Sequence, residues 1–280
     1  MLLVKSKTIL KLFFVETKRK LTAIIDFAYL FLLNFDFKNN SKSRHKKITF
    51  VTAADQKYYL KANRLIKSIN KTNPDSNIFF YNLDSKNEFN FENLKNVKYY
   101  DFEFDKYPNF LKESHFSKYD NDNKLGSYAW KAVIISEVAN KSNGILLWLD
   151  AASIVTKNLN QLKKVIVKRS FYSPISSNKI KDWTHFSLIK KLHLSETFIN
   201  KKNLSSGCVG FDLENKINSE IIIKWKLMSL DEDFIKPKGS SRLNHRQDQA
   251  LLTIIYHQAY IKKLFPKTHK IFGIKLQVKL

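Results

Sequence analysis

The stretch "ITFVTAADQKYYLKANRLIKSINKTNPDSNIFFYNLD" (residues 48–84) decides the fold that the chain can adopt. Residues 48–54 form a short apolar run rich in β-branched side chains, which is typical of a buried strand. Asp55 follows as a helix N-cap. Apolar side chains then recur at helical spacing: Tyr58, Ala62, Leu65, Ile66 and Ile69. The turn at 73–77 ends this helix and residues 78–84 start a second strand, so we predict a βαβ unit with parallel strands and a right-handed crossover.

A second unit of the same kind is expected further along the chain. Ser127 is predicted to cap a helix, and Asn143-Gly144 to turn the chain into the strand "ILLWL" (145–149). The helix would bury Trp130, Val133, Ile134 and Val138. Asp150 then lies just past the carboxyl end of a buried strand, where open α/β sheets bind their ligands. The alternative is that Asp150 only caps the next turn.

Composition limits the class of protein. The chain has 280 residues, 44% of them hydrophobic and 14% aromatic, which is too apolar for disorder and favours one main domain. The single cysteine, Cys208, excludes an internal disulfide framework and a cysteine-based zinc site, so a reducing compartment is expected. The net charge of +24 calls for an acidic partner: nucleic acid, anionic lipid or a phosphorylated small molecule. A merely solvated lysine surface is the other interpretation.

Residues 1–46 differ from the rest and are predicted to be a helical extension of a domain at 47–280. Its apolar run, "LTAIIDFAYLFLLNFDF" (21–37), is broken by Asp26 and is short against the roughly 20 apolar residues of a spanning helix. No small-residue cleavage site follows it. Two interpretations remain: an amphipathic helix lying on an anionic membrane surface, or a helix packed on the main domain.

Four blocks resemble, in order, the family 8 glycosyltransferases. These are residues 48–84, "YAWKAVIISEVANKSNGILLWLDAASIV" (128–155), "SSGCVGFDL" (205–213) and "RQDQALL" (246–252). The resemblance implies a GT-A fold, an α/β architecture with a mixed, mainly parallel central sheet flanked by helices. It also implies transfer of a sugar from a nucleotide-diphosphate donor to a glycan or lipid-linked acceptor, with retention of configuration.

The resemblance also implies roles for single residues. Catalysis would fall to Asp150, Asp248 and Gln249. The nucleotide-sugar would be bound by Ala53, Ala54, Asp55, Tyr58, Lys131, Ser205, Ser206, Gly207, Arg242 and Arg246. Negative charge grows on the leaving diphosphate as the glycosidic bond breaks, and cations aimed at that charge provide most of the catalysis. Lys131 matches the family's basic helix position, and loop 236–246 supplies further cations.

The metal site departs from the family pattern. Relatives hold Mn²⁺ or Mg²⁺ with an Asp-x-Asp motif and a histidine, and these ions favour oxygen ligands. Here Ala152 replaces the second carboxylate, and His269 in "HKIFGIK" is a weak counterpart of the histidine. A metal held by Asp150 and His269 would be weakly bound, so basic side chains would have to compensate.

Three functions follow from the sequence. The first is a glycosyltransferase in the cytoplasm, peripheral to the inner face of a membrane. The second is a degenerate member of the same fold that binds a nucleotide-sugar or glycan without turning it over, because Ala152 removes a carboxylate. The third, a nucleic-acid-binding protein, rests on charge alone, since no motif of nucleic-acid recognition is visible.

Overall fold

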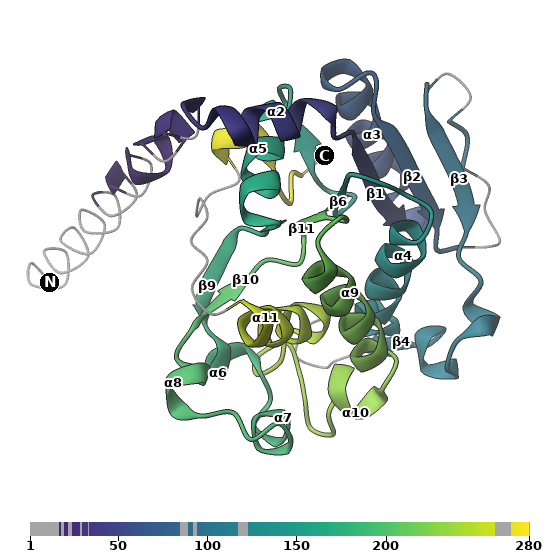
Figure 1. Cartoon of the computed structure of the whole chain (residues 1–280). Coiled ribbons are helices and arrows are strands. Elements are labelled where there is room, and N and C mark those ends of the chain that lie inside the picture. The colour runs from purple at the N-terminus through teal and green to yellow at the C-terminus, as the bar shows by residue number, and fades with distance from the viewer. Residues whose placement is uncertain are drawn as a thin grey trace, which may run out of the picture.

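The structure is a computed structural model and describes residues 17, 20–21, 24–28, 30–32, 34–84, 89–91, 94–116, 123–260 and 270–279. Its centre is a mixed sheet of six strands in the order β3-β2-β1-β6-β11-β8 (Figure 1). Their bounds are β1 Ile48–Ala54, β2 Asn77–Asn82, β3 Val97–Asp101, β6 Ile145–Leu149, β8 Phe171–Tyr172 and β11 Cys208–Asp212. Strands β3, β2, β1 and β6 are parallel, while β11 is antiparallel to both of its neighbours. The fold is therefore the predicted mixed α/β class with a mostly parallel sheet.

Helices and shorter elements surround the sheet. The helices are α2 Phe37–His45, α3 Tyr59–Thr72, α4 Ala129–Ala139, α5 Asn160–Arg169, α6 Ile180–Trp183, α7 Phe186–Lys191, α8 Glu196–Ile199, α9 Lys216–Ser229, α10 Glu232–Ile235 and α11 Gln247–Ala259. Short 3-10 turns are η1 Gln56–Tyr58, η2 Phe104–Lys106, η3 Asn109–Leu111, η4 Gly126–Tyr128 and η5 Lys270–Phe272. Two-stranded ribbons pair β4 Ser114–Phe116 with β5 Asn123–Leu125, β9 Ile175–Lys179 with β10 Lys202–Leu204, and β7 Ile154–Val155 with β12 Ile274–Lys275.

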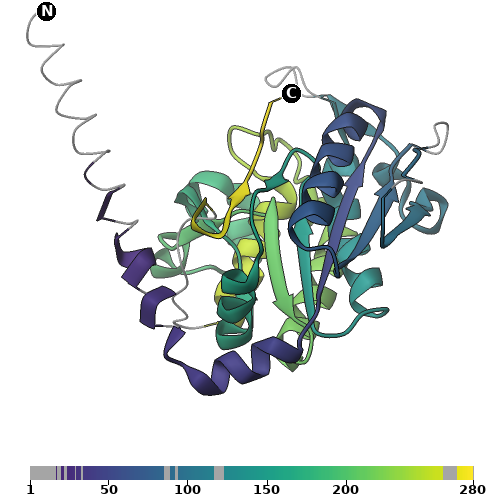
Figure 2. The ribbon, with the colours of Figure 1, turned by 90° about the horizontal axis from the view of Figure 1, so that it is seen from above.

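Two hydrophobic clusters cover the two faces of the sheet. Helices α4, α9 and α11 pack in one cluster, and α3 and α5 pack in the other (Figure 2). Side chains alternate along β1, so Val51 enters the first cluster while Phe50 enters the second. Because α4 lies between the sheet and helices α9 and α11, nine of its eleven residues are buried. Polar side chains on α4 consequently need partners inside the protein.

The first βαβ unit is confirmed. β1 and β2 are parallel neighbours, and α3 connects them through a buried stripe at Ala62, Leu65, Ile66 and Ile69. Asp55 caps the intervening turn η1, where its Oδ1 accepts a hydrogen bond of 3.1 Å from the amide of Tyr58.

The second unit is confirmed except at the start of its helix. β6 forms where a strand was predicted, and it pairs in parallel with β1. The expected N-cap role of Ser127 is wrong, because α4 begins at Ala129 after Tyr128 and no side chain caps it. Gly126, Ser127 and Tyr128 all have positive φ angles of 53°, 50° and 64°, so the chain enters α4 through a left-handed turn instead of an extended cap.

The part of the chain that the structure describes holds no helix long and apolar enough to cross a membrane.

Close packing at Gly210 gives a test of the fold. A Cβ atom at this position in β11 would lie 2.5 Å from Cδ1 of Ile166 on α5. We therefore expect Gly210→Ala to lower the free energy of unfolding by about 1–3 kcal/mol, measured by urea denaturation. Adding Ile166→Val, which deletes that Cδ1, should recover part of the loss. Equal urea midpoints for wild type and Gly210→Ala would contradict this packing.

Candidate functional site

The sheet topology brings three separate segments to one edge. β1 and β6 are parallel neighbours, so Asp55 after β1 and Asp150 after β6 lie at the same edge. β11 runs the other way and begins there, which places the turn 205–207 beside Asp150. The amide of Asp150 donates a 3.0 Å hydrogen bond to the carbonyl of Gly207.

A buried lysine joins two carboxylates at this edge. Nζ of Lys131 on α4 lies 3.1 Å from Oδ1 of Asp150 and 2.9 Å from Oδ2 of Asp248 in the first turn of α11. It also lies 3.4 Å from both the carbonyl oxygen and Oγ of Ser206. The side chains of Lys131 and Asp248 are 4% and 5% exposed, whereas that of Asp150 is 40% exposed. Asp150 is therefore the member of this charged trio that a ligand can reach.

The charges of the trio depend on one another. Burial lowers the pKa of Lys131, but Asp150 and Asp248 together raise it above its ordinary value. Burial raises the pKa of Asp248, and the ammonium of Lys131 opposes that rise. With all three groups ionised, one cation faces two anions. The trio therefore favours hydroxyl or cationic ligand groups next to Asp150 and disfavours a bare anion.

Trp148 and Gly207 fix the position of the Asp150 carboxylate. Nε1 of Trp148 donates a 2.8 Å hydrogen bond to Oδ1 of Asp150. Oδ2 lies beside Gly207, where an added Cβ would come within 2.9 Å of it. Oδ1 is thus occupied by Trp148 and Lys131, which leaves Oδ2 as the acceptor for a ligand.

The neighbouring turn and Gln249 complete this part of the edge. Oγ of Ser205 accepts a 3.4 Å hydrogen bond from the amide of Gly207, and the amide of Ser205 donates one of 3.1 Å to Oγ of Ser173. Gln249, which follows Asp248 on α11, is half-buried, and its Nε2 lies 3.5 Å from Oγ of Ser176.

The predicted nucleotide-binding residues lie on β1 and the turn after it. Ala53 and Ala54 are buried, while Asp55 is half-buried, and burial raises the pKa of Asp55. Tyr58 packs partly against the cluster of α3 and α5, and Nζ of Lys61 lies 4.8 Å from its ring centroid. Tyr58 is thus half-buried, and an ammonium already lies over its ring.

The basic loop before α11 is held by aromatic stacking. The guanidinium carbon of Arg246 lies 3.9 Å from the ring centroid of Trp183, and the amide of Arg246 donates a 3.0 Å hydrogen bond to the carbonyl of Trp183. Arg246 is only two residues before Asp248. Arg242 is half-buried in the same loop, but no contact joins it to the trio.

Two residues of this edge were missed by sequence reasoning. Trp148 had a usable signal, because residues two apart on a strand share a face and so place its indole beside Asp150. Trp183 had none, since its contact with Arg246 joins the end of α6 to the loop before α11, and only the tertiary fold brings these together.

The described residues do not fit a divalent metal at this edge. The ammonium of Lys131 already lies between Asp150 and Asp248, and Ala152 offers no carboxylate. The carbonyl of Ala152 accepts a 2.8 Å hydrogen bond from the amide of Val278. Among the described residues no cluster of three or more His, Cys, Asp or Glu side chains could hold a metal, and His269 lies outside them.

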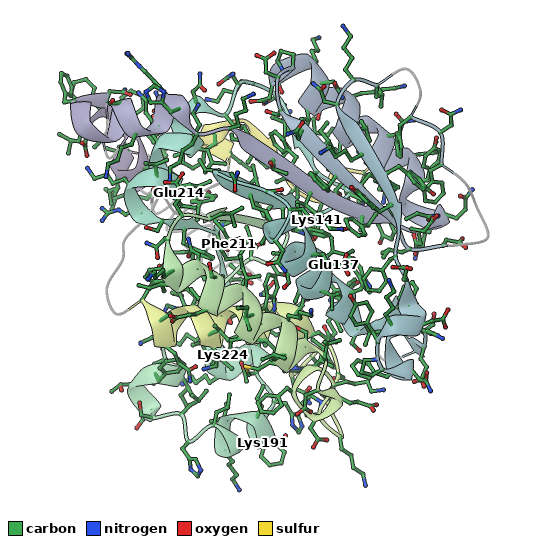
Figure 3. All side chains as sticks on the ribbon, turned by 45° about the vertical axis from the view of Figure 1, so that its right-hand side comes forward. Glu137, Lys141, Lys191, Phe211, Glu214 and Lys224 are labelled. Carbon is green, nitrogen blue, oxygen red and sulfur yellow. The ribbon has the colours of Figure 1, made fainter. Side chains whose placement is uncertain are left out.

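A cavity among the described residues lies at the opposite edge of the sheet. It has a volume of about 860 Å³, and we call it the basal cavity. Its charged lining residues are Lys42, His45, Lys46, Lys47, Lys98, Lys141, Asp212 and Glu214. Figure 3 labels Lys141, just after α4, and Glu214, just after β11. Lys46 pairs with Asp212 at 2.5 Å and with Glu214 at 3.0 Å. None of the residues predicted from the sequence lines this cavity.

Comparison with known proteins gives a family match and several similar folds. Residues 32–136, less than half of the chain, match the family described as "Protein of unknown function (DUF1647)". No curated protein sequence matches the chain significantly.

Among solved structures, the bifunctional glycosyltransferase WbbM is 12% identical with a TM-score of 0.44, over 77% of this chain and 38% of its own. The galactosyltransferase LgtC, solved with donor and acceptor sugar analogues, is 17% identical with a TM-score of 0.45, over 74% of this chain and 70% of its own. GlyE of Streptococcus pneumoniae TIGR4 is 15% identical with a TM-score of 0.42, over 77% of this chain and 45% of its own. The chain thus spans well under half of the WbbM chain.

Replacing Lys131 by methionine tests the charged trio. The change keeps the length of the side chain but leaves Asp248 buried without its cation, so we expect a loss of about 3–5 kcal/mol in unfolding free energy at neutral pH. Without Lys131, the folded-state pKa of Asp248 should rise further above its unfolded value. In Lys131→Met the protonated form of Asp248 therefore stabilises the folded state. This stabilisation is fully present below the unfolded-state pKa of Asp248 and is lost as pH rises through the folded-state pKa.

Urea denaturation at pH 5 and pH 8 checks this expectation. The difference in stability between wild type and Lys131→Met should be larger at pH 8. The double variant Lys131→Met/Asp248→Asn should recover stability at pH 8, because no buried charge remains unpaired there. A Lys131→Met protein as stable as wild type at both pH values would show that the trio contributes nothing.

Proposed function

We propose that the chain is a GT-A-type glycosyltransferase that takes its sugar from a nucleotide-diphosphate donor. One observation carries the proposal: Lys131 contacts Asp150, Asp248 and Ser206, so residues from three of the blocks that resemble family 8 enzymes meet at one point. The fourth block contributes Asp55 at the same sheet edge. Such an edge, outside the carboxyl ends of parallel strands, is where α/β folds bind nucleotides.

The trio suits the sugar rather than the diphosphate. Asp150 is the exposed acceptor and would accept hydrogen bonds from sugar hydroxyls, while the buried Asp248 would hold the ammonium of Lys131 beside it. The missing side chain at Gly207 leaves room for the carboxylate of Asp150 beside the backbone. In this proposal Lys131 is a positioning residue that acts through Asp150.

The leaving diphosphate needs cations from another element. Arg246, two residues before Asp248, stacks on Trp183. Its guanidinium can bind a phosphate through two parallel hydrogen bonds. Arg242 and the exposed Lys238 belong to the same loop. We propose that this loop, 236–246, closes over the diphosphate and stabilises the charge that develops on it.

The nucleoside would lie along the end of β1. The backbone of Ala53 and Ala54 and the carboxylate of Asp55 would contact the base and ribose, with Tyr58 beside the base. The half-buried Asp55 remains available to a ribose hydroxyl through Oδ2, since Oδ1 accepts the amide of Tyr58.

Gln249 would lie at the reacting face of the sugar. A glutamine amide is a poor nucleophile, but its carbonyl oxygen would stabilise a positively charged, oxocarbenium-like transition state. We propose on this basis that configuration is retained by attack on the same face. The acceptor would be a glycan or a glycolipid, and the chain would work in the cytoplasm as a peripheral protein of a membrane.

Ala152 favours a second candidate, a binding protein of the same fold that does not turn over its donor. Ala152 lacks the carboxylate that would help to hold a divalent metal, and metal-assisted sugar transfer would depend on that metal. Binding of a nucleotide-sugar without transfer or hydrolysis by the wild-type chain would favour this candidate.

Asp150→Asn tests the proposed site directly. Turnover of the best donor in a panel of UDP-, GDP-, CMP- and dTDP-sugars should fall by about a hundredfold or more, since the amide donates where the carboxylate accepted. Asp75→Asn, at an exposed turn between α3 and β2, is the matched control and should keep wild-type turnover. Equal turnover in Asp150→Asn and wild type would exclude this edge as the active site.

Metal dependence gives a second test. Because a lysine already lies between the two carboxylates, we propose that transfer proceeds without a divalent ion. Treatment with EDTA should then leave turnover within about twofold of the untreated rate, and added Mn²⁺ or Mg²⁺ should not raise it further. Loss of activity in EDTA that returns with Mn²⁺ would contradict metal-independent transfer and leave the site assignment standing.

A further inference from the structure

The N-terminal segment exposes an unusual number of apolar side chains. Half of the exposed large hydrophobic residues among those described, seven of fourteen, fall within residues 21–35. They are Leu21, Ile24, Ile25, Phe27, Phe31, Leu32 and Phe35, with exposed fractions between 50% and 72%. A water-soluble surface seldom gathers so many large apolar groups in so short a segment, and such patches mark contact with a partner or a membrane.

The exposed apolar residues form one side of a helix. Residues 24–28, 30–32 and 34 are helical, and at 3.6 residues per turn the six apolar positions from Leu21 to Leu32 fall in an arc of roughly 160°. The other side of the segment contacts the protein. Asp26 is buried and Leu30 packs against the cluster of α3 and α5.

Polar contacts to α5 fix the orientation of this segment. Oδ1 of Asn34 accepts 3.1 Å hydrogen bonds from Gln161 and Lys164, and Asp36 pairs with Lys168 at 2.7 Å. Figures 1 and 2 show the described part of the segment continuing beyond α2. Because the polar side of the segment contacts α5, its apolar side faces outward. A helix that covers a hydrophobic core has the opposite orientation, with its apolar side inward.

Exposed basic residues follow the apolar segment in the sequence. Lys42, Arg44 and His45 lie in the last turn of α2, and Lys47 follows it; all four are exposed. The first turn of α2 carries no acidic residue. An apolar helix side followed by a cluster of exposed basic residues is the composition that binds the boundary between acyl chains and anionic headgroups.

We infer that residues 21–47 dock the chain on the surface of an anionic lipid bilayer. The apolar side chains enter the boundary below the headgroups, and the cations of α2 contact lipid phosphates. A second copy of the chain fits this surface less well, because a symmetric pairing would bring the two cationic α2 helices near each other. The inference extends the proposed membrane location and does not depend on glycosyl transfer.

Vesicle co-sedimentation tests the docking surface. The full chain should bind phosphatidylcholine vesicles that contain about 30% phosphatidylserine more tightly than pure phosphatidylcholine vesicles, and added salt should weaken the binding. The variant Ile24→Ser/Phe27→Ser/Phe31→Ser should bind at least about tenfold more weakly, since three apolar side chains that would enter the bilayer are lost. The charge variant Lys42→Gln/Arg44→Gln/Lys47→Gln should lose the preference for phosphatidylserine.

The exposed face of α9 supplies a matched control. Ile223→Ser/Leu227→Ser replaces residues that are 55% and 61% exposed on a different helix and should bind vesicles as wild type does. Circular dichroism and thermal melting confirm that each variant is folded. Equal vesicle binding by wild type and the triple serine variant would overturn the inference. A second result would also overturn it: wild type binds no vesicles but forms dimers in sedimentation velocity, and the triple serine variant does not form them. Nucleotide-sugar turnover with a soluble acceptor is measured in parallel, so loss of docking and loss of transfer are distinguished.

Discussion

The contact of Lys131 with Asp150 and Asp248 is the interaction on which the candidate site depends. An ammonium and a carboxylate that are each about 5% exposed or less cannot be solvated, so each is stable only because of the other. The contact also joins α4 and the end of β6 to the start of α11, which is distant from both in the sequence. Any rearrangement that separates these elements leaves a charge buried without a partner.

The same contact determines which chemistry the edge can perform. Its two carboxylates and one ammonium leave an acceptor at the exposed Asp150, while Trp148 and Gly207 restrict where that acceptor lies. The cations suited to a diphosphate are in a different place, on the loop held by Trp183. The edge therefore separates recognition of sugar hydroxyls from neutralisation of phosphate.

Periodicity in the sequence predicted the frame of the fold because buried strands and amphipathic helices have simple patterns. β1, α3, β2 and β6 were predicted in this way, and so was the place of Asp150 beyond a strand end. Lys131 could be found only through the family resemblance, since α4 is buried nearly all round and its hydrophobic pattern marks no face. The left-handed entry at Ser127 and the stacking of Arg246 on Trp183 depend on tertiary contacts that no local pattern encodes.

A crystal structure of the chain with the nucleotide-sugar that stabilises it most would test the central claim most directly. We predict that the sugar contacts Asp150, that the diphosphate lies against the loop before α11, and that the nucleoside lies along the end of β1. A nucleotide bound in the basal cavity at the opposite edge of the sheet, with Asp150 facing only solvent, would contradict it.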